Sequence, residues 1–168
     1  MSILTELIDP ELLKADTPDP RYVGSIFQEI KPLPARQKGS RMEQIVACVY
    51  SRLGHQVQNA GSSDYDRVIN GARCEIKGAT LVKNQHLFSF LQIRPNQEYD
   101  FLIFAMFYPD DLVIMEMTKQ RILELIADKT FSKQHGGNSA ESGTYCYYGT
   151  PDTLALLGAK RLENLNGC

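Results

Sequence analysis

The sequence has little that would place the protein in a membrane or in an oxidising compartment. No apolar run approaches the roughly 18 residues that indicate a membrane-spanning helix. The N-terminal stretch is acidic and lacks the basic and then apolar layout of a secretory signal. None of the four cysteines forms a Cys-x-x-Cys pair, so neither a disulfide framework nor a zinc knuckle is expected. We therefore expect a cytoplasmic protein with reduced thiols and no membrane partner.

The chain also lacks an overall excess of charge of either sign. Its 168 residues include 18 basic and 20 acidic side chains, a net charge of -2 that by itself suggests no nucleic-acid partner. The distribution is nevertheless uneven. Residues 1–30 and residues 95–168 each have a net charge of -4, whereas residues 31–94 contain 10 basic and 4 acidic groups, a net charge of +6. The middle of the chain is therefore a basic segment inside an acidic total.

The length and the hydrophobic pattern predict one domain of the α/β class with a mixed central sheet. We divide it into an N-terminal helical extension over 1–34, a core over 35–130, and a C-terminal part over 131–168 made of a loop, a short strand and a helix. Helices are predicted over 37–53, from a Thr118 cap to 128, and over 152–165; strands are predicted over 56–59, 66–69, 73–77, 101–107, 112–117 and 145–148. A further helix is expected between residue 77 and residue 101.

Three charged residues meet in the predicted hairpin around Asn70-Gly71, a dipeptide typical of two-residue turns. Asp66 begins the first strand, and Glu75 and Lys77 alternate on the second, so that the latter two share a face. Two adjacent carboxylates repel each other, and a hard divalent cation would remove the conflict. Mg²⁺ prefers oxygen ligands and binds one or two carboxylates together with substrate phosphate. The cluster therefore suits hydrolysis of a phosphodiester, with Lys77 beside the attacking water or the developing charge.

This pattern, Asp66 followed by Glu75-Ile76-Lys77, resembles the PD-(D/E)xK nuclease superfamily with its restriction-endonuclease-like fold. Glu43, on the helix before the hairpin, matches the position of a further acid in that family. The segments Phe90-Leu91-Gln92-Ile93-Arg94-Pro95 and Lys133-Gln134-His135-Gly136-Gly137 also look like those of small type II restriction endonucleases. The resemblance covers about residues 36–140. No proline precedes Asp66. Members of the family often lack this proline.

The resemblance implies a Mg²⁺-dependent, sequence-specific endonuclease that cleaves double-stranded DNA and leaves 5′-phosphates, with Mn²⁺ able to substitute. Asp66 and Glu75 would hold the metal, and Lys77 and Glu43 would complete the catalytic set. A palindromic site would require a homodimer. Candidate DNA contacts are Arg36, Lys38, Arg41, Lys83, Gln92, Arg94, Lys133, Gln134 and His135.

Several alternatives stay open at this level. Asp64 can replace Asp66 as the ligand, and Glu43 can be an ordinary acid near a helix N-terminus. Glu75 and Lys77 can form an exposed surface pair of little energetic value. The same fold also serves structure-selective repair nucleases, junction resolvases and DNA-binding modules with an idle site.

Overall fold

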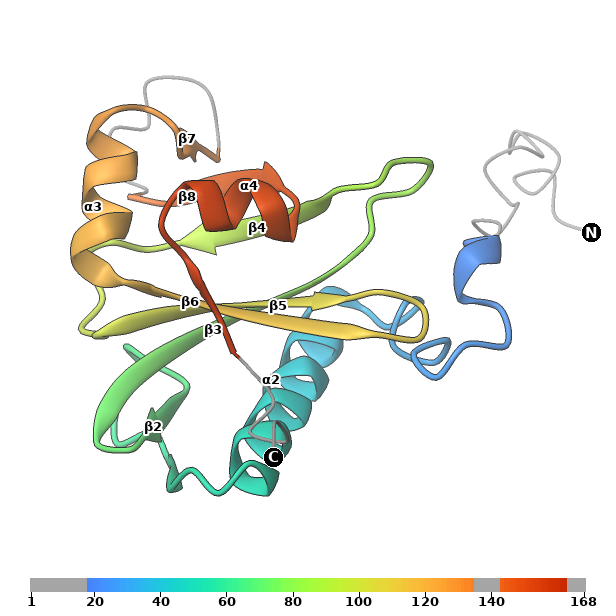
Figure 1. Ribbon diagram of the computed structural model, residues 1–168, viewed down its shortest axis with the longest axis horizontal. Helices are drawn as coiled ribbons and strands as arrows, with labels where there is room; N and C mark the ends of the chain where they lie inside the picture. The colour runs from blue at the N-terminus through green and yellow to red at the C-terminus, as the bar shows by residue number, and fades with distance from the viewer. Residues whose placement is uncertain (1–17, 135–142, 163–168) are drawn as a thin grey trace, which may run out of the picture.

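A computed structural model describes residues 18–134 and 143–162, which form two stacked sheets with helices on the outside (Figure 1). The larger sheet has six strands in the order β1-β2-β3-β5-β6-β9. Their bounds are Val57–Asn59, Arg67–Ile69, Ala72–Thr80, Phe101–Phe107, Leu112–Thr118 and Lys160–Arg161. The β3–β5 pair is parallel and the other pairs are antiparallel. The predicted α/β class with a mixed central sheet is therefore confirmed.

Helix α2 (Ala35–Arg52) covers one face of this sheet. Met42, Val46 and Tyr50 recur four residues apart, so they form one buried stripe that packs against the sheet. The helix ends just before Gly54, whose φ of 89° is a left-handed conformation that suits glycine at a helix end. The helix predicted over 37–53 is thus confirmed, with its start two residues earlier.

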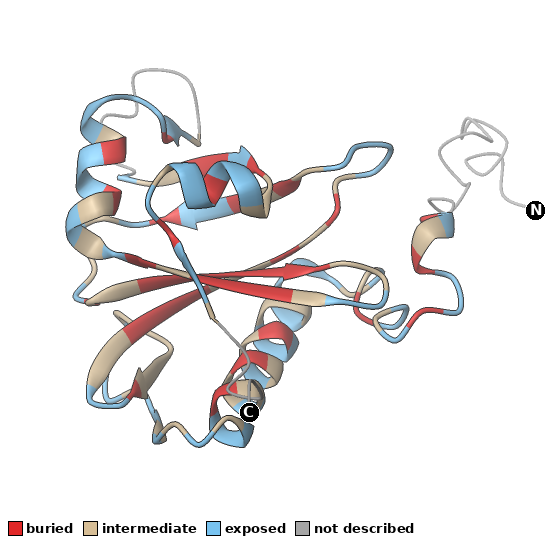
Figure 2. Cartoon of the chain, in the orientation of Figure 1, coloured by how far each residue is buried: buried red, intermediate tan, exposed pale blue. Residues whose placement is uncertain are grey.

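The opposite face of the large sheet is covered by a second sheet and two further helices. The second sheet has the order β4-β8-β7, with β4 at Phe88–Ile93, β8 at Tyr145–Gly149 and β7 at Ser132–Lys133. Helices α3 (Lys119–Ala127) and α4 (Pro151–Leu156) complete this layer. The Phe104 ring meets those of Phe90 and Phe131 edge to face between the layers. Figure 2 shows buried residues concentrated on the central strands.

Two predicted helices differ from the structure. The segment between β3 and β5 contains no helix; it is a β-hairpin arm that ends in β4, because Phe88, Phe90 and Ile93 are buried in the second sheet. The helix predicted over 152–165 stops at Leu156, since Gly158 has a φ of 97° and the chain then pairs with β6 as β9. Residues 163–165 lie outside the described part.

The N-terminal segment is tied to the core by its polar groups. Its described part, from residue 18 to residue 34, contains one short 3-10 helix, η2 (Pro20–Tyr22), followed by turns. The Tyr22 hydroxyl donates to the carbonyl of Phe107 at 2.5 Å and accepts from the N–H of Leu81 at 2.9 Å. Asp19 accepts hydrogen bonds from Arg21, and Arg21 donates to the carbonyl of Val82. This segment therefore fixes the start of the arm that leads to β4.

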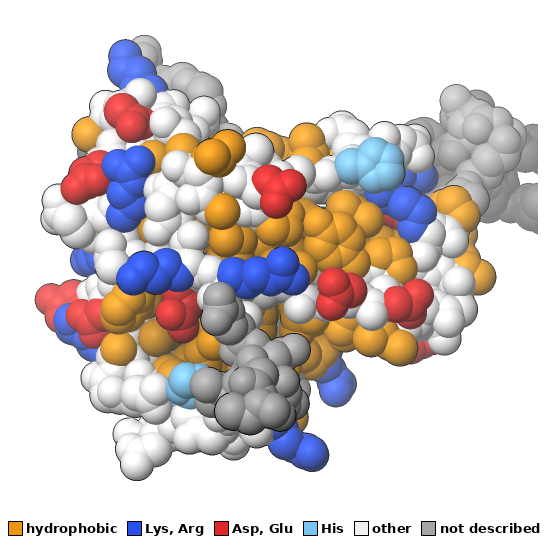
Figure 3. Space-filling model, viewed as in Figure 1, with side chains coloured by type: hydrophobic (Ala, Val, Ile, Leu, Met, Phe, Trp, Pro, Cys, Tyr) orange, Lys and Arg blue, Asp and Glu red, His pale blue; other side chains and the backbone are white. Residues whose placement is uncertain are grey.

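The surface carries one notable apolar area. Figure 3 shows hydrophobic side chains gathered beside the turn that joins β5 to β6. Asp110 and Asp111 of this turn line a shallow hollow of about 310 Å³, together with apolar side chains that include Ile26, Phe27 and Leu112. Within the part of the chain that the structure describes, no helix combines the length and apolarity needed to cross a membrane.

Candidate active site

The candidate site lies where strand β3 loses its partner β2. The β2–β3 ladder covers only Ala72 to Cys74 on β3. Just beyond it, the main-chain N–H of Asp66 donates to the carbonyl of Cys74 at 2.9 Å, and the Asp66 carboxylate accepts from the N–H of Ile76 at 2.7 Å. A side chain thus continues the ladder for one more step and holds the Asp66 carboxylate beside Glu75.

Asp64, the alternative ligand, lies in the loop before this point. Its N–H donates to the hydroxyl of Ser62 at 3.1 Å. The Asp66 side chain, by contrast, accepts a hydrogen bond from the main chain of β3 at Ile76. The geometry therefore favours Asp66 over Asp64 as the residue that meets Glu75.

Glu75 and Lys77 form an ion pair on the face of β3 that is turned toward the second sheet. Lys77 Nζ lies 2.7 Å from Glu75 Oε1, with 19% of the lysine side chain and 8% of the glutamate side chain exposed. Their neighbours on β5 are the buried Leu102 and Phe104. The alternative of an exposed surface pair is therefore wrong. A charged pair withdrawn this far from water is costly unless further polar groups or ions compensate it.

The environment of Glu75 disfavours its charge. Burial raises the pKa of Glu75 to about 7; the Lys77 ammonium opposes this shift, and the Asp66 carboxyl group reinforces it. Burial first, and the nearby Asp66 carboxyl group second, therefore favour the protonated form of Glu75. This is the conflict that a cation between the two carboxyl groups would relieve.

Glu43 approaches the same site from helix α2, on the other side of the sheet edge. Burial raises its pKa, and the charge of Asp66 raises it further. The approach depends on Gly78 of β3, because a Cβ at this position would lie 2.7 Å from Cβ of Met42, the neighbour of Glu43. The missing side chain lets α2 pack closely enough for Glu43 and Lys77 to line one groove.

This groove has a volume of about 910 Å³ and runs along β3 between α2 and β4. Its lining contains four cations and one carboxylate: Lys31, Arg36, Lys38, Lys77 and Glu43. Lys31 donates a hydrogen bond to the carbonyl of Leu81, and its Nζ lies 3.6 Å from Oδ2 of Asp19. Asp19 therefore partly neutralises the charge of Lys31. The groove lining is therefore mainly basic, and its one carboxylate, Glu43, comes from helix α2.

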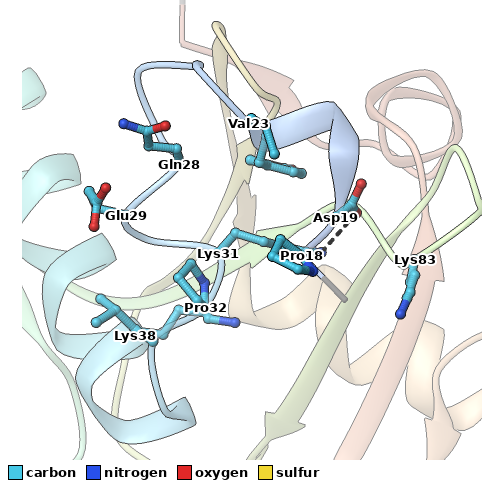
Figure 4. A pocket seen from close by; sticks show the side chains of 11 residues that line it. Pro18, Asp19, Val23, Gln28, Glu29, Lys31, Pro32, Lys38 and Lys83 are labelled. Atoms are coloured by element: carbon cyan, nitrogen blue, oxygen red, sulfur yellow. Dashed lines mark ion pairs between the residues drawn. The ribbon is translucent and has the colours of Figure 1, made fainter. Parts of the chain in front are cut away.

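A second hollow of about 570 Å³ adjoins the groove and shares Lys31 and Lys38 with it. Figure 4 shows Lys31, Lys38 and Lys83 around this hollow, with a dashed line for the ion pair between Lys31 and Asp19. Burial lowers the pKa of Lys38. Lys83, one of the predicted DNA contacts, thus lies at this hollow and not in the groove.

The other predicted DNA contacts are divided. Arg36, Lys38 and Gln92 line the groove. Arg41 and Arg94 are exposed outside its lining, and Lys133 is exposed on β7. Gln134 is half-buried and bonded to β4. His135 lies outside the described residues.

Some residues of the site region were not anticipated from sequence. Ser89 and Leu91 line the groove from β4. They were missed because the sequence pattern of this segment did not distinguish a strand from a helix. Tyr99 is buried, and in the described part its hydroxyl has no hydrogen-bond partner. Burial raises the pKa of Tyr99 and the charge of Glu75 raises it further. Only the tertiary fold brings these side chains near β3.

The side chains available here suit a hard cation that needs only one or two ligands from the protein. Among the described residues, no group of three or more His, Cys, Asp and Glu side chains is arranged to hold a metal ion. The site instead offers the two neighbouring carboxyl groups of Asp66 and Glu75. Mg²⁺ commonly binds one or two carboxylates and completes its shell with water and substrate phosphate. The residues present therefore fit Mg²⁺ and do not fit a cation that needs a complete protein cage.

Comparisons with known proteins give a likeness to solved structures but none to a known family or curated sequence. No known protein family matches the chain, and no curated protein is similar to it in sequence. Among solved structures, a bacterial homing endonuclease, I-Ssp6803I, is similar with 11% identity and a TM-score of 0.45, over 68% of this chain and 74% of that one. A likeness at this level carries no information about activity.

Proposed function

We propose that the protein is a Mg²⁺-dependent endonuclease that cleaves double-stranded DNA at a specific sequence, in the manner of a type II restriction endonuclease. One observation carries this proposal: the buried Glu75–Lys77 pair lies at the free edge of β3 beside the Asp66 carboxylate, and Lys77 of this pair lines a basic groove. Acid and base groups of this kind, withdrawn from water beside a cationic cleft, suit phosphodiester hydrolysis.

Asp66 and Glu75 would hold the metal. One oxygen of Asp66 accepts from Ile76, and one oxygen of Glu75 pairs with Lys77, so each carboxyl group has a second oxygen to offer. A bound Mg²⁺ would lower the pKa of a water molecule and offset charge on the phosphate. Mn²⁺ accepts similar oxygen ligands and should substitute.

Lys77 and Glu43 would act on the water and the phosphate from the protein side. The Lys77 ammonium, paired with Glu75, would orient the attacking water and stabilise negative charge that develops on the phosphate oxygens. Glu43 lies in the same groove, and burial raises its pKa, which makes its carboxylate a stronger proton acceptor than an exposed one. Cleavage would leave 5′-phosphates.

The groove supplies the contacts to the substrate. Arg36 and Lys38 line it on the α2 side, where they can neutralise phosphates, and Gln92 lines it on the β4 side. Such a groove matches an acidic, extended partner better than a small apolar ligand. We further propose that the active form is a homodimer, because a palindromic site calls for two symmetry-related copies of the groove.

The test is cleavage of plasmid DNA with Mg²⁺, and separately with Mn²⁺, by the wild type, Lys77→Met and Asp64→Asn. We expect discrete fragments from the wild type and from Asp64→Asn, which changes a neighbouring acid outside the cluster. Lys77→Met retains most of the side-chain volume and should lose about 10²–10⁴-fold in rate. Full cleavage by Lys77→Met would overturn the proposal.

The same preparation separates this function from its alternatives. A junction resolvase would cut branched DNA and leave the linear duplex intact. An idle binding module would bind DNA in Ca²⁺ but cut nothing in Mg²⁺ or Mn²⁺. Mapping the fragment ends on a known genome would report the recognition site and the stagger together.

A further inference from the structure

The wall of the groove formed by β4 contains a bulge. Phe90 pairs with Tyr147 and Ile93 with Tyr145, so Leu91 and Gln92 together oppose the single residue Cys146. Gln92 has a φ of 56°, a left-handed conformation that residues with a side chain seldom adopt. Strained backbone of this kind concentrates at functional sites, where the surrounding structure maintains it.

A side chain from the neighbouring strand holds this bulge in place. The main-chain N–H of Gln92 donates to Oε1 of Gln134 at 2.5 Å. Gln134 is itself fixed at the end of β7, because its main-chain N–H donates to the carbonyl of Thr144 at 3.1 Å. The amide that the bulge removes from the ladder is therefore satisfied by a carboxamide from 42 residues further along the chain.

The bulge directs its residues at the groove. Leu91, with 42% of its surface exposed, and Gln92, also exposed, line the same groove as Lys77 and Glu43. Within residues 18–134 and 143–162, the Gln92 carboxamide makes no hydrogen bond of its own. An uncommitted donor and acceptor are thus presented toward the proposed substrate from a backbone that the fold has to restrain.

We propose that the Leu91–Gln92 bulge is the base-reading element of the groove, that Gln92 contacts an adenine edge, and that Gln134 is a positioning residue which sets the direction of Gln92. This inference rests on the proposed endonuclease function. A glutamine carboxamide matches the N6 donor and N7 acceptor of adenine in the major groove. In contrast to the prediction from sequence, Gln134 would then act through Gln92 and not on DNA.

The experiment compares the sequence preference of four proteins on a duplex library with a randomised site: wild type, Gln92→Ala, Gln134→Leu and Gln134→Glu. Gln134→Glu retains an acceptor oxygen for the Gln92 N–H, whereas Gln134→Leu has a similar size and none. We expect Gln92→Ala and Gln134→Leu to lose roughly 5- to 150-fold of the preference for adenine at one position. Gln134→Glu should keep the wild-type preference, and Gln58→Ala on the distant strand β1 should also keep it.

Each outcome decides between the two proposals. Equal relaxation by Gln134→Glu and Gln134→Leu would mean that Gln134 reads DNA itself, which overturns its positioning role. A preference unchanged in Gln92→Ala overturns the base-reading role while the endonuclease proposal stands. If the wild type neither cuts the library nor selects a sequence from it in Ca²⁺, both proposals fail. Amide hydrogen exchange adds a readout without DNA: the Gln92 N–H should lose protection in Gln134→Leu and keep it in Gln134→Glu.

Discussion

The carboxylate of Asp66 accepts a hydrogen bond of 2.7 Å from the main-chain N–H of Ile76, the residue between Glu75 and Lys77. This bond replaces the strand pairing that β2 no longer supplies, so one side chain both completes the sheet edge and presents a carboxylate there. Structure and proposed chemistry therefore depend on the same residue, and substitutions can separate them.

Asp66→Asn should separate the two roles. The amide oxygen of asparagine can still accept from Ile76, so the free energy of unfolding should change by less than about 1 kcal/mol. The lost charge should lower Mg²⁺-dependent cleavage by about 100-fold or more. Asp66→Ala should lose the same activity and also about 1–3 kcal/mol of stability, because the Ile76 N–H is left without its acceptor. Urea unfolding and single-turnover cleavage measure the two effects, and full activity in Asp66→Asn would contradict the role.

Metal binding should depend on pH through Glu75. The pKa of Glu75 is raised to about 7 in the metal-free protein, so below this pH the carboxyl group holds a proton that a cation must displace. Mg²⁺ affinity should therefore rise with pH up to about 7 and level off above it. Calorimetry in buffers of different ionisation enthalpy should detect proton release near pH 6.5 that disappears near about pH 8.5. Affinity that is constant over this range would show that Glu75 is not a ligand.

Gly78→Ala should move helix α2 and with it Glu43. The new methyl group would lie 2.6 Å from Sδ and 2.7 Å from Cβ of Met42, so the helix has to shift. Overpacking of this kind typically costs about 1–3 kcal/mol. Met42→Ala should cost about 2–5 kcal/mol alone, and the double variant should cost clearly less than the sum, since each change relieves the other. Additive unfolding free energies would argue against the contact.

DNA affinity should depend on salt through the groove cations. Replacing both Arg36 and Lys38 by alanine should reduce the slope of log affinity against log salt concentration by about two. Arg41→Ala is the matched control, because Arg41 is on the same helix but outside the groove lining. Titrations at several salt concentrations measure the slope. If Arg41→Ala reduced the salt slope as much as each groove residue does, phosphate contacts would extend beyond the groove.

Asp19 should contribute stability that is lost in acid. Hydrogen bonds from Arg21 hold the pKa of Asp19 at about 2, below its value in an unfolded chain. Its contribution is therefore complete above about pH 4 and falls as the pH drops toward 2. Asp19→Asn should lower the free energy of unfolding by about 1–3 kcal/mol at pH 7, and the gap to the wild type should narrow below about pH 4. Glu29→Gln, an exposed acid of the same segment, should show no such gap.

Local patterns accounted for much of the fold. The predictions for α2, β5, β6 and the Asn70-Gly71 hairpin are confirmed, and Thr118 caps α3 as expected, with its hydroxyl accepting from Arg121. These elements could be predicted because burial gives the hydrophobic residues a period of 3.6 residues in a helix and two in a strand. Turns and helix caps, in addition, require particular residues. The C-terminal helix was overextended because a two-residue strand such as β9 leaves no periodic pattern.

The sequence by itself determined the composition of the candidate site: an Asp, a Glu-x-Lys pair and an acid on the preceding helix, inside the basic part of the chain. Only the tertiary structure decided which groups meet. The early end of β2 exposes the edge where Asp66 is bonded, Gly78 lets α2 approach, and the β4 bulge is held by Gln134. Each of these depends on contacts between residues far apart in the chain, and such contacts are selected by packing and hydrogen-bond satisfaction over the whole domain, which no local pattern records.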